Sequence, residues 1–130
     1  MILIIGGMGQ GKRAFARKLA GTKAPEFDAN LADGLSDPPR FALQKPYLTS
    51  FQGWIRQILE AGGDPEEFVG RVLAGMPRII TMDEVGCGIV PAERTERDYR
   101  EAAGHAGQML AANASEVYRV ICGIPQKIKG

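Results

Sequence analysis

Apolar residues gather along the chain in two patterns, short continuous runs and longer stretches with a helical period. The β-branched run at 1–5 predicts a buried strand, and the stretches at 78–82 and 116–122 predict two further strands. Stretches with apolar residues every three or four positions lie between them, at 12–20, 51–61, 65–74 and about 92–113. Strands that alternate with helices predict an α/β fold, with a parallel sheet joined by right-handed crossovers.

The helical pattern is strongest after Ser50. Its apolar positions follow the i, i+3, i+4, i+7, i+8 spacing of one helix face: Phe51, Trp54, Ile55, Ile58 and Leu59. Thr49 or Ser50 can cap the start of this helix, and Gly62 and Gly63 end it. At this spacing we interpret Trp54 as a core residue rather than as a surface on which a substrate stacks.

In two segments the apolar residues follow no sustained helical or strand period. Residues 22–46 are rich in Pro, Asp, Asn and Gly, which predicts irregular or partly mobile chain. Residues 123–130 predict a Gly-Ile-Pro turn followed by a basic tail.

The length, net charge and composition of the chain narrow the class of protein. With 130 residues the chain is long enough for one domain, 1–130, and too short for two. Its formal net charge of +1 does not indicate nucleic acid or an anionic membrane as a partner. No apolar stretch reaches the roughly 18 residues of a membrane helix, and the run at 1–5 is too short for a signal peptide, so we expect a cytoplasmic protein. Two cysteines and one histidine suggest neither a disulfide framework nor a classical zinc site.

A glycine-rich loop joins the first predicted strand to the first predicted helix. Its residues satisfy the phosphate-loop pattern G-x-x-x-x-G-K: Gly6, Gly7, Met8, Gly9, Gln10, Gly11 and Lys12. Glycines let backbone N–H groups converge on an anion, while the helix N-terminus and the lysine add positive charge. The loop therefore predicts a nucleotide-phosphate site. The alternative is a plain glycine-rich turn between strand and helix.

The residue after this loop departs from the pattern. A Ser or Thr hydroxyl that ligates magnesium is expected there, but the residue is Arg13. A guanidinium cannot coordinate a cation, and its charge repels one. Two interpretations remain open. Arg13 contacts a phosphate directly and partly replaces the metal, or the site has decayed and Arg13 is a solvated helix residue.

A longer and more irregular pattern lies in the second half of the chain. It consists of T-M-D-E-V-G-C-G-I-V-P at 81–91, E-R at 93–94, Y-R-E-A-A-G at 99–104 and Q-M-L-A at 108–111. This pattern resembles the adenosylcobinamide kinase/adenosylcobinamide-phosphate guanylyltransferase family. The closing strand, the tail and the phosphate loop fit as well, so the resemblance covers 1–20 and about 47–130. It implies a single-domain, P-loop NTPase-like three-layer α/β fold with a small, mainly parallel sheet.

The resemblance implies two activities. One transfers the γ-phosphate of a nucleotide to the hydroxyl of adenosylcobinamide, and the other attaches GMP from GTP to the product through a guanylylated histidine. In the family this histidine follows the second strand, but the corresponding segment here, 22–46, is shorter and contains none. His105 lies in the late helix, and we interpret it as a helix-face residue. The guanylyltransferase activity is therefore expected to be lost.

Four further positions bear on catalysis. Family members tend to have an acid where this chain has Thr49, so magnesium loses a second expected partner. Asp83 and Glu84 end a predicted strand, where open parallel sheets bind ligands. They either bind metal or orient the acceptor hydroxyl, or else Asp83 caps a turn while Glu84 accepts hydrogen bonds from loop amides. Cys87, between two glycines, is interpreted as a small buried thiol.

These features predict a nucleotide-dependent kinase that phosphorylates cobinamide or a related corrinoid in cobalamin biosynthesis or salvage. Lys12 and Glu84 are the predicted catalytic residues. The predicted phosphate contacts are Gly6, Gly7, Met8, Gly9, Gln10, Gly11, Lys12 and Arg13. ATP or GTP is the expected cosubstrate; Mg²⁺ is compatible with the site, but no ligands are assigned to it. A homo-oligomer is compatible with the sequence, whereas nucleic acid and membrane are not expected partners. The alternative is a non-catalytic relative that binds nucleotide or corrinoid as a regulator or subunit.

Overall fold

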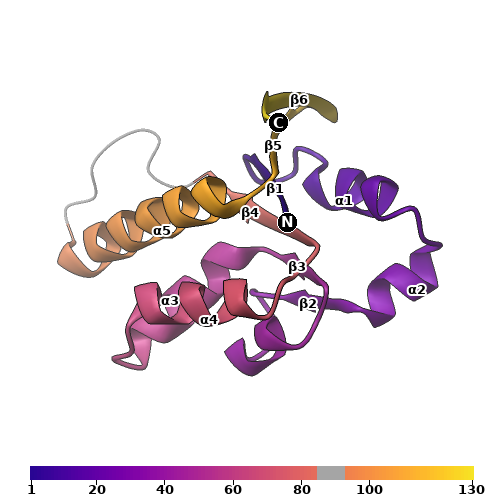
Figure 1. Cartoon of the computed structure of the whole chain (residues 1–130). Helices are drawn as coiled ribbons and strands as arrows, with labels where there is room; N and C mark the ends of the chain where they lie inside the picture. The colour runs from indigo at the N-terminus through magenta and orange to yellow at the C-terminus, as the bar shows by residue number, and fades with distance from the viewer. Residues whose placement is uncertain (85–92) are drawn as a thin grey trace.

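The computed structural model describes residues 1–84 and 93–130, which form one sheet with helices on both faces (Figure 1). In chain order the elements are β1 (Ile2–Gly6), α1 (Lys12–Ala20), α2 (Ala24–Ala29), β2 (Leu31–Asp33), η1 (Pro39–Leu43), β3 (Tyr47–Thr49), α3 (Phe51–Glu60), α4 (Pro65–Ala74), β4 (Ile79–Asp83), α5 (Arg94–Asn113), β5 (Glu116–Ile121) and β6 (Ile124–Lys129). The strands lie side by side in the order β2-β3-β4-β1-β5-β6. All neighbouring pairs are parallel except β5 with β6. The predicted mainly parallel sheet is therefore confirmed.

The central strand β1 explains why this sheet carries helices on both faces. It pairs with β4 on one side and with β5 on the other. Leu3 lies in the larger core cluster and the next residue, Ile4, in the smaller one, because successive side chains of a strand point to opposite faces. A strand buried on both faces has a continuous apolar sequence, and this is the pattern that predicts β1.

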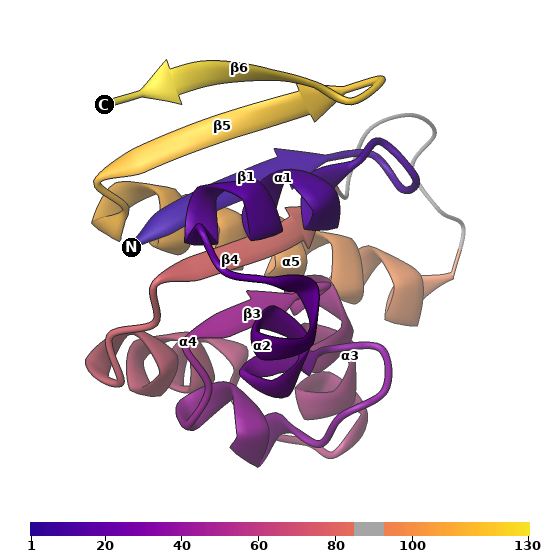
Figure 2. The same ribbon diagram turned by 90° about the vertical axis from the view of Figure 1, so that its right-hand side faces the viewer.

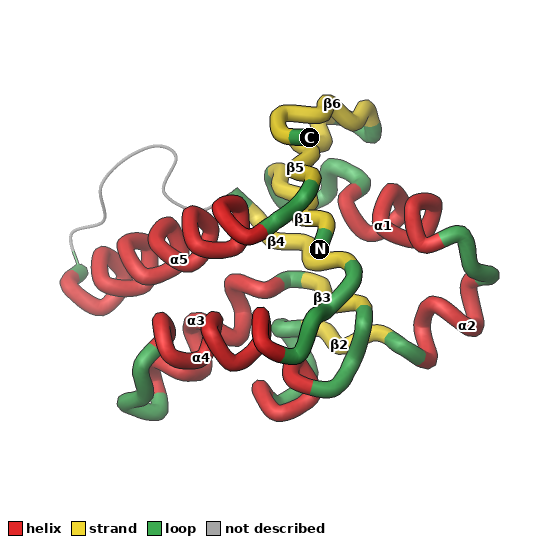
Figure 3. The backbone as a smooth tube through the Cα atoms, viewed as in Figure 1, coloured by secondary structure: helices red, strands yellow, loops and turns green. Residues whose placement is uncertain are grey.

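Three layers result, as Figure 1 and Figure 3 show. Helices α3, α4 and α5 cover one face of the sheet, and Trp54, Val72 and Leu110 belong to the core there. Helices α1 and α2 lie on the other face, with Ala16 and Phe27 in the smaller core. The side chain of Trp54 is fully buried, and its Nε1 donates a 3.0 Å hydrogen bond to the Asp37 carbonyl. Its interpretation as a core residue is confirmed.

The expectation of irregular chain at 22–46 is wrong for much of that segment. It contains the short helix α2, the edge strand β2 and the 3₁₀ helix η1. Strand β2 has three residues and pairs in parallel with β3, so that its last residue, Asp33, is the register partner of Thr49. Elements of three to six residues are too short to show a period, so they were invisible in the sequence pattern. Their tertiary partners hold them in place instead.

The expected basic tail is also wrong, because residues 124–129 form strand β6. Two residues, Cys122 and Gly123, connect it to β5, and both have positive φ, 50° and 76°. Such a connection is typical of a type I′ hairpin turn. Every residue of β6 is exposed, so no alternation of apolar and polar positions marks it in the sequence.

Two strands extend one residue beyond their predicted ends. Strand β1 ends at Gly6 and β4 at Asp83, and these two residues are register partners. The carboxylate of Asp83 therefore belongs to the same edge of the sheet as the glycine loop. Within the described ranges, no helix is long and apolar enough to cross a membrane.

Candidate functional site

The glycine loop connects β1 to α1 at the carboxyl end of the parallel strands. Figure 2 shows this loop extending beyond the arrowhead of β1 before the chain turns back into α1. Two of its glycines are required by geometry. A Cβ on Gly6 would lie 2.5 Å from the Val120 carbonyl oxygen, and Gly11 has a φ of 97°. Both positions are closed to other residues without strain, which agrees with the phosphate-loop interpretation.

The loop presents backbone donors that no described part of the protein uses. The N–H groups of Met8, Gly9 and Gly11 donate no hydrogen bond to another described residue. The first amides of α1 add to these donors, because the opening turn of a helix has no intrahelical acceptor for them. That turn contains no acidic residue. The loop therefore offers unpaired N–H groups and the positive end of a helix dipole to an anion.

Lys12 lies beneath the loop, with only 8% of its side chain exposed. Its Nζ donates a 2.7 Å hydrogen bond to the Gly7 carbonyl oxygen and lies 2.7 Å from Asp83 Oδ1. The ammonium is thus held at the predicted anion site, between the ends of β1 and β4. A phosphate bound in the loop would share this cation with Asp83 or draw it away from that carboxylate.

The turn between β5 and β6 supports the loop from behind. The Cys122 N–H donates to Gln10 Oε1 over 2.6 Å, and the Gly123 N–H donates to the Gln10 carbonyl oxygen over 2.8 Å. The sequence gives no sign of this contact, because its partners lie more than a hundred positions apart. The role of Gln10 as an anchor is therefore a finding of the tertiary structure.

A cavity of about 260 Å³ opens beside the loop. Its lining includes the loop residues from Met8 to Arg13 and the strand-end residues Asp33, Thr49, Ser50, Thr81 and Asp83. The Ser50 N–H donates to Thr81 Oγ1 over 3.2 Å. The hydroxyl of Thr49 is buried and has no hydrogen-bond partner among the described residues. Carboxyl ends of four parallel strands meet here, which is the usual ligand position in an open parallel sheet.

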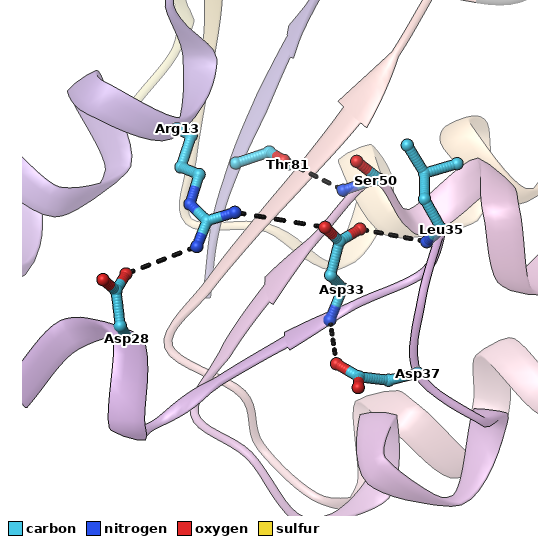
Figure 4. A network of polar contacts seen from close by, with 7 residues as sticks. All are labelled: Arg13, Asp28, Asp33, Leu35, Asp37, Ser50 and Thr81. Atoms are coloured by element: carbon cyan, nitrogen blue, oxygen red, sulfur yellow. Dashed lines mark hydrogen bonds and ion pairs between the residues drawn. The ribbon is translucent and has the colours of Figure 1, made fainter.

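Arg13 crosses the rim of this cavity (Figure 4). Its Nη2 lies 3.3 Å from Asp28 Oδ1, and its Nη1 lies 4.0 Å from Asp33 Oδ2. Asp33 is itself oriented by the backbone, because its Oδ1 accepts a 2.9 Å hydrogen bond from the Leu35 N–H. The sequence pattern did not identify Asp33, which the pairing of β2 with β3 brings to this site.

These residues do not suit a magnesium ion. Among the described residues that line the cavity, Asp33 faces the cationic side chain of Arg13, and Asp83 faces that of Lys12. Nowhere in the described part of the chain do three acidic, histidine or cysteine side chains form a group that could hold a metal. Mg²⁺ favours free carboxylate and hydroxyl oxygens in octahedral geometry, and a guanidinium at the rim opposes it.

A second, larger hollow of about 640 Å³ adjoins the cavity, and Met8, Leu35 and Asp83 line both. Arg56 lies 3.9 Å above the Tyr99 ring and donates to both carboxylate oxygens of Glu96. These hydrogen bonds hold the pKa of the Glu96 carboxyl below its ordinary value. Burial raises the pKa of the Tyr99 phenol, so this ring stays neutral. The hollow therefore combines an apolar ring with fixed charges of both signs.

Glu84 borders this second hollow. Its carboxylate receives two hydrogen bonds from Arg119, of 2.6 and 3.1 Å, and its N–H donates to the Gly6 carbonyl oxygen. The predicted alternatives for Asp83 and Glu84 did not include their actual partners, Lys12 and Arg119. Both residues line the larger hollow, and Asp83 also lines the cavity beside the loop.

Other candidate residues lie elsewhere. His105 is exposed on α5, and its Nε2 lies 3.8 Å from Glu66 Oε2, beside a separate hollow of about 290 Å³. The interpretation of His105 as a helix-face residue is therefore confirmed. Cys87 and most of the motif at 81–91 fall within 85–92, outside the described residues.

A mainly parallel sheet between two layers of helices, with this glycine loop after its first strand, defines a P-loop NTPase-like fold. Residues 52–128, more than half of the chain, match the family model described as cobinamide kinase / cobinamide phosphate guanyltransferase. The chain belongs to this family. The matched range does not include the glycine loop, so the case for a phosphate site depends on the geometry given above.

Two curated relatives are similar to a shorter stretch. Both carry the description bifunctional adenosylcobalamin biosynthesis protein CobU, one from Escherichia coli (strain K12) and one from Salmonella typhimurium (strain LT2). Each is 49% identical over 51 residues, which cover 39% of this chain and 28% of the relative. The chain thus aligns with less than a third of either relative's length.

Proposed function

We propose that this protein transfers the γ-phosphate of ATP or GTP to a hydroxyl of cobinamide or a related corrinoid. Membership of the family supports a role in adenosylcobalamin biosynthesis. The observation that carries the proposal is the position of Lys12, held beneath unpaired loop amides in a cavity that adjoins a larger hollow. A nucleotide in the cavity and an acceptor in the hollow would meet at Asp83 and Glu84.

In this proposal the groups between the cavity and the larger hollow divide the steps of phosphoryl transfer among them. Loop amides bind the phosphates, and Lys12 stabilises the charge on the transferring phosphoryl group. The bond from the γ-phosphorus to its bridging oxygen breaks, and a bond to the acceptor oxygen forms. Glu84 orients the acceptor hydroxyl and takes its proton, which then passes to solvent. Arg119 holds the Glu84 carboxylate in position through its two hydrogen bonds.

We propose further that the guanylyltransferase activity implied by the resemblance is lost. The segment 22–46 contains no histidine, although its strand β2 borders the cavity through Asp33. His105 lines a different hollow, on α5, together with Asp64 and Glu66. Incubation with GTP labelled in the α-phosphate would test this point, and covalent labelling of the protein would contradict it.

A second candidate function is binding without turnover. It is favoured by the charge balance of the cavity, where each carboxylate faces a cation and no metal group is formed by the described residues. A protein of this kind would bind nucleotide or corrinoid as a regulator or subunit.

Label transfer separates the two functions. Purified protein is incubated with γ-labelled ATP or GTP and cobinamide, with and without Mg²⁺, beside a Lys12→Ala variant. Lys18→Ala is the matched control, because Lys18 is exposed on the same helix. Transfer by the wild type and Lys18→Ala, but not by Lys12→Ala, is the expected result. Nucleotide binding with no transfer to any corrinoid would reject the kinase in favour of the binding function.

A further inference from the structure

We propose that this site binds its polyphosphate without a divalent cation, and that the Arg13 guanidinium supplies the positive charge in its place. The proposal rests on the nucleotide site proposed above. It identifies the ligand as the metal-free polyphosphate chain of ATP or GTP, rather than as its magnesium complex.

The position of Arg13 is the first argument. It directly follows Lys12, at the second residue of α1, and it lines the cavity beside the loop amides. Its side chain is 54% exposed and touches Asp28 and Asp33 at 3.3 and 4.0 Å. Ion pairs as exposed and as long as these contribute little. The guanidinium can therefore turn to a phosphate at small cost and bind two of its oxygens at once.

The charges around the cavity are the second argument. Asp83 is balanced by Lys12, and Asp33 is balanced by Arg13 and a backbone N–H. The cavity thus already contains two cationic and two anionic side chains from the described residues. A divalent cation would be repelled by Lys12 and Arg13, whereas an anionic phosphate is attracted to both.

The buried hydroxyl of Thr49 is the third argument. It occupies the end of β3, where its register partner is Asp33. It is 4% exposed and its oxygen has no partner among the described residues. A threonine hydroxyl is able to ligate a cation, but it is neutral and offsets none of the positive charge that Lys12 and Arg13 already bring to this cavity. Neither Thr49 at the end of β3 nor Arg13 at the start of α1 therefore adds a negative charge that would favour a magnesium ion.

Calorimetric titration of the full chain with ATP, and separately with GTP, tests the proposal. Each titration is run in excess EDTA and in excess MgCl₂. The wild type is expected to have dissociation constants that agree within about twofold in the two conditions. Arg13→Ser is expected to bind about tenfold more weakly in EDTA, since it loses a charge-assisted hydrogen bond, and to recover when Mg²⁺ is added. Arg17→Ser, on the exposed side of the same helix, is the matched control and should bind as the wild type does.

Asp28→Asn provides a test that does not remove Arg13. It releases the guanidinium from its nearer partner, so nucleotide is expected to bind about two- to threefold more tightly in EDTA. Thermal unfolding of each variant shows whether it is folded. Should Arg13→Ser unfold, Arg13→Gln takes its place with the same expected loss.

Two results would overturn the proposal and leave the nucleotide site standing. One is wild-type binding that is at least about tenfold tighter with Mg²⁺; the other is normal binding by Arg13→Ser in EDTA. Failure of the nucleotide site itself looks different. The wild type and Lys12→Ala would then bind neither nucleotide in either condition, and both proposals would fall.

Discussion

The Lys12 ammonium is shared between the Gly7 carbonyl and the Asp83 carboxylate at equal distances of 2.7 Å. A side chain held in this way enters the reaction already oriented, so little conformational entropy is lost when a phosphate binds. The same contact neutralises Asp83, while Glu84, paired with Arg119, lines the larger hollow. Substitution of a side chain between the cavity and the larger hollow is therefore expected to change the rate of phosphoryl transfer more than it changes the affinity for nucleotide.

Glu84→Gln tests this expectation. The amide can still accept a hydrogen bond, but it cannot take the acceptor proton, so the turnover number for label transfer should fall by about a hundredfold. The dissociation constant of the nucleotide should change by less than about threefold, since Glu84 lines the acceptor hollow and not the cavity beside the loop. Glu101→Gln, exposed on α5, is the control. An unchanged turnover number would remove Glu84 from the mechanism.

The glycine loop depends on an element from the other end of the chain. Gln10 accepts one hydrogen bond on its side chain and one on its carbonyl, both from the turn between β5 and β6. Gln10→Ala removes the first of these and leaves the Cys122 N–H without its acceptor. Nucleotide affinity should fall about fivefold, because one net hydrogen bond contributes about 1 kcal/mol. Gln126→Ala on the exposed strand β6 controls for a general effect on the hairpin, and equal losses in both variants would contradict the anchor.

Helix α3 packs its backbone closely against the loop after β2 at Gly53 and Gly34, which both line the larger hollow. A Cβ on Gly53 would lie 2.2 Å from the Gly34 carbonyl oxygen. Gly53→Ala should therefore lower the free energy of unfolding by about 1–3 kcal/mol, as overpacking typically does. A Cβ on Gly70, in α4, would meet nothing within 4 Å, so Gly70→Ala should raise it by up to about 1 kcal/mol.

Denaturant unfolding followed by tryptophan fluorescence measures both glycine variants, because Trp54 is the single tryptophan and is fully buried. Equal stability of the two variants would show that the backbone contact between α3 and the loop after β2 is not tight in solution.

At the scale of the whole molecule, ion pairs join different helices and strands. Arg56 of α3 binds Glu96 of α5, and Lys127 of β6 binds Glu116 of β5. Hydrogen bonds from Lys127 and Tyr118 lower the pKa of the Glu116 carboxyl. A carboxyl with a lowered pKa binds fewer protons in the folded than in the unfolded state, so it contributes stability above its ordinary pKa.

This contribution is lost as the pH falls from about 4.3, the ordinary pKa of Glu, through the lower pKa of the folded state. Lys127→Met should therefore flatten the dependence of unfolding free energy on pH in that window, with little change in slope between pH values of about 6 and 7. Denaturant unfolding at several pH values measures it. Lys18→Met, on exposed α1, serves as control, and an equal slope for wild type and Lys127→Met below about pH 4.3 would contradict the linkage.

Part of this architecture could be read from residues alone. Strands β1 and β4 leave short, mainly apolar runs, β5 is recognisable from its apolar residues although Glu116 and Arg119 interrupt them, and α3 has a clear helical period. The loop after β1 was recognisable because its glycine and lysine spacing is fixed by local chain geometry. Elements α2, β2, η1, β3 and β6 were missed, because each is short or exposed and is held by distant partners.

The sequence by itself determined the fold class, the family and the position of the glycine loop, since these depend on local spacing and on burial that repeats along the chain. The tertiary structure alone decided which side chains meet there. It placed Asp33 near Arg13, Asp83 on Lys12 and Arg119 on Glu84. The physical reason is that strand order and register, which no local pattern encodes, bring these strand ends to one edge of the sheet.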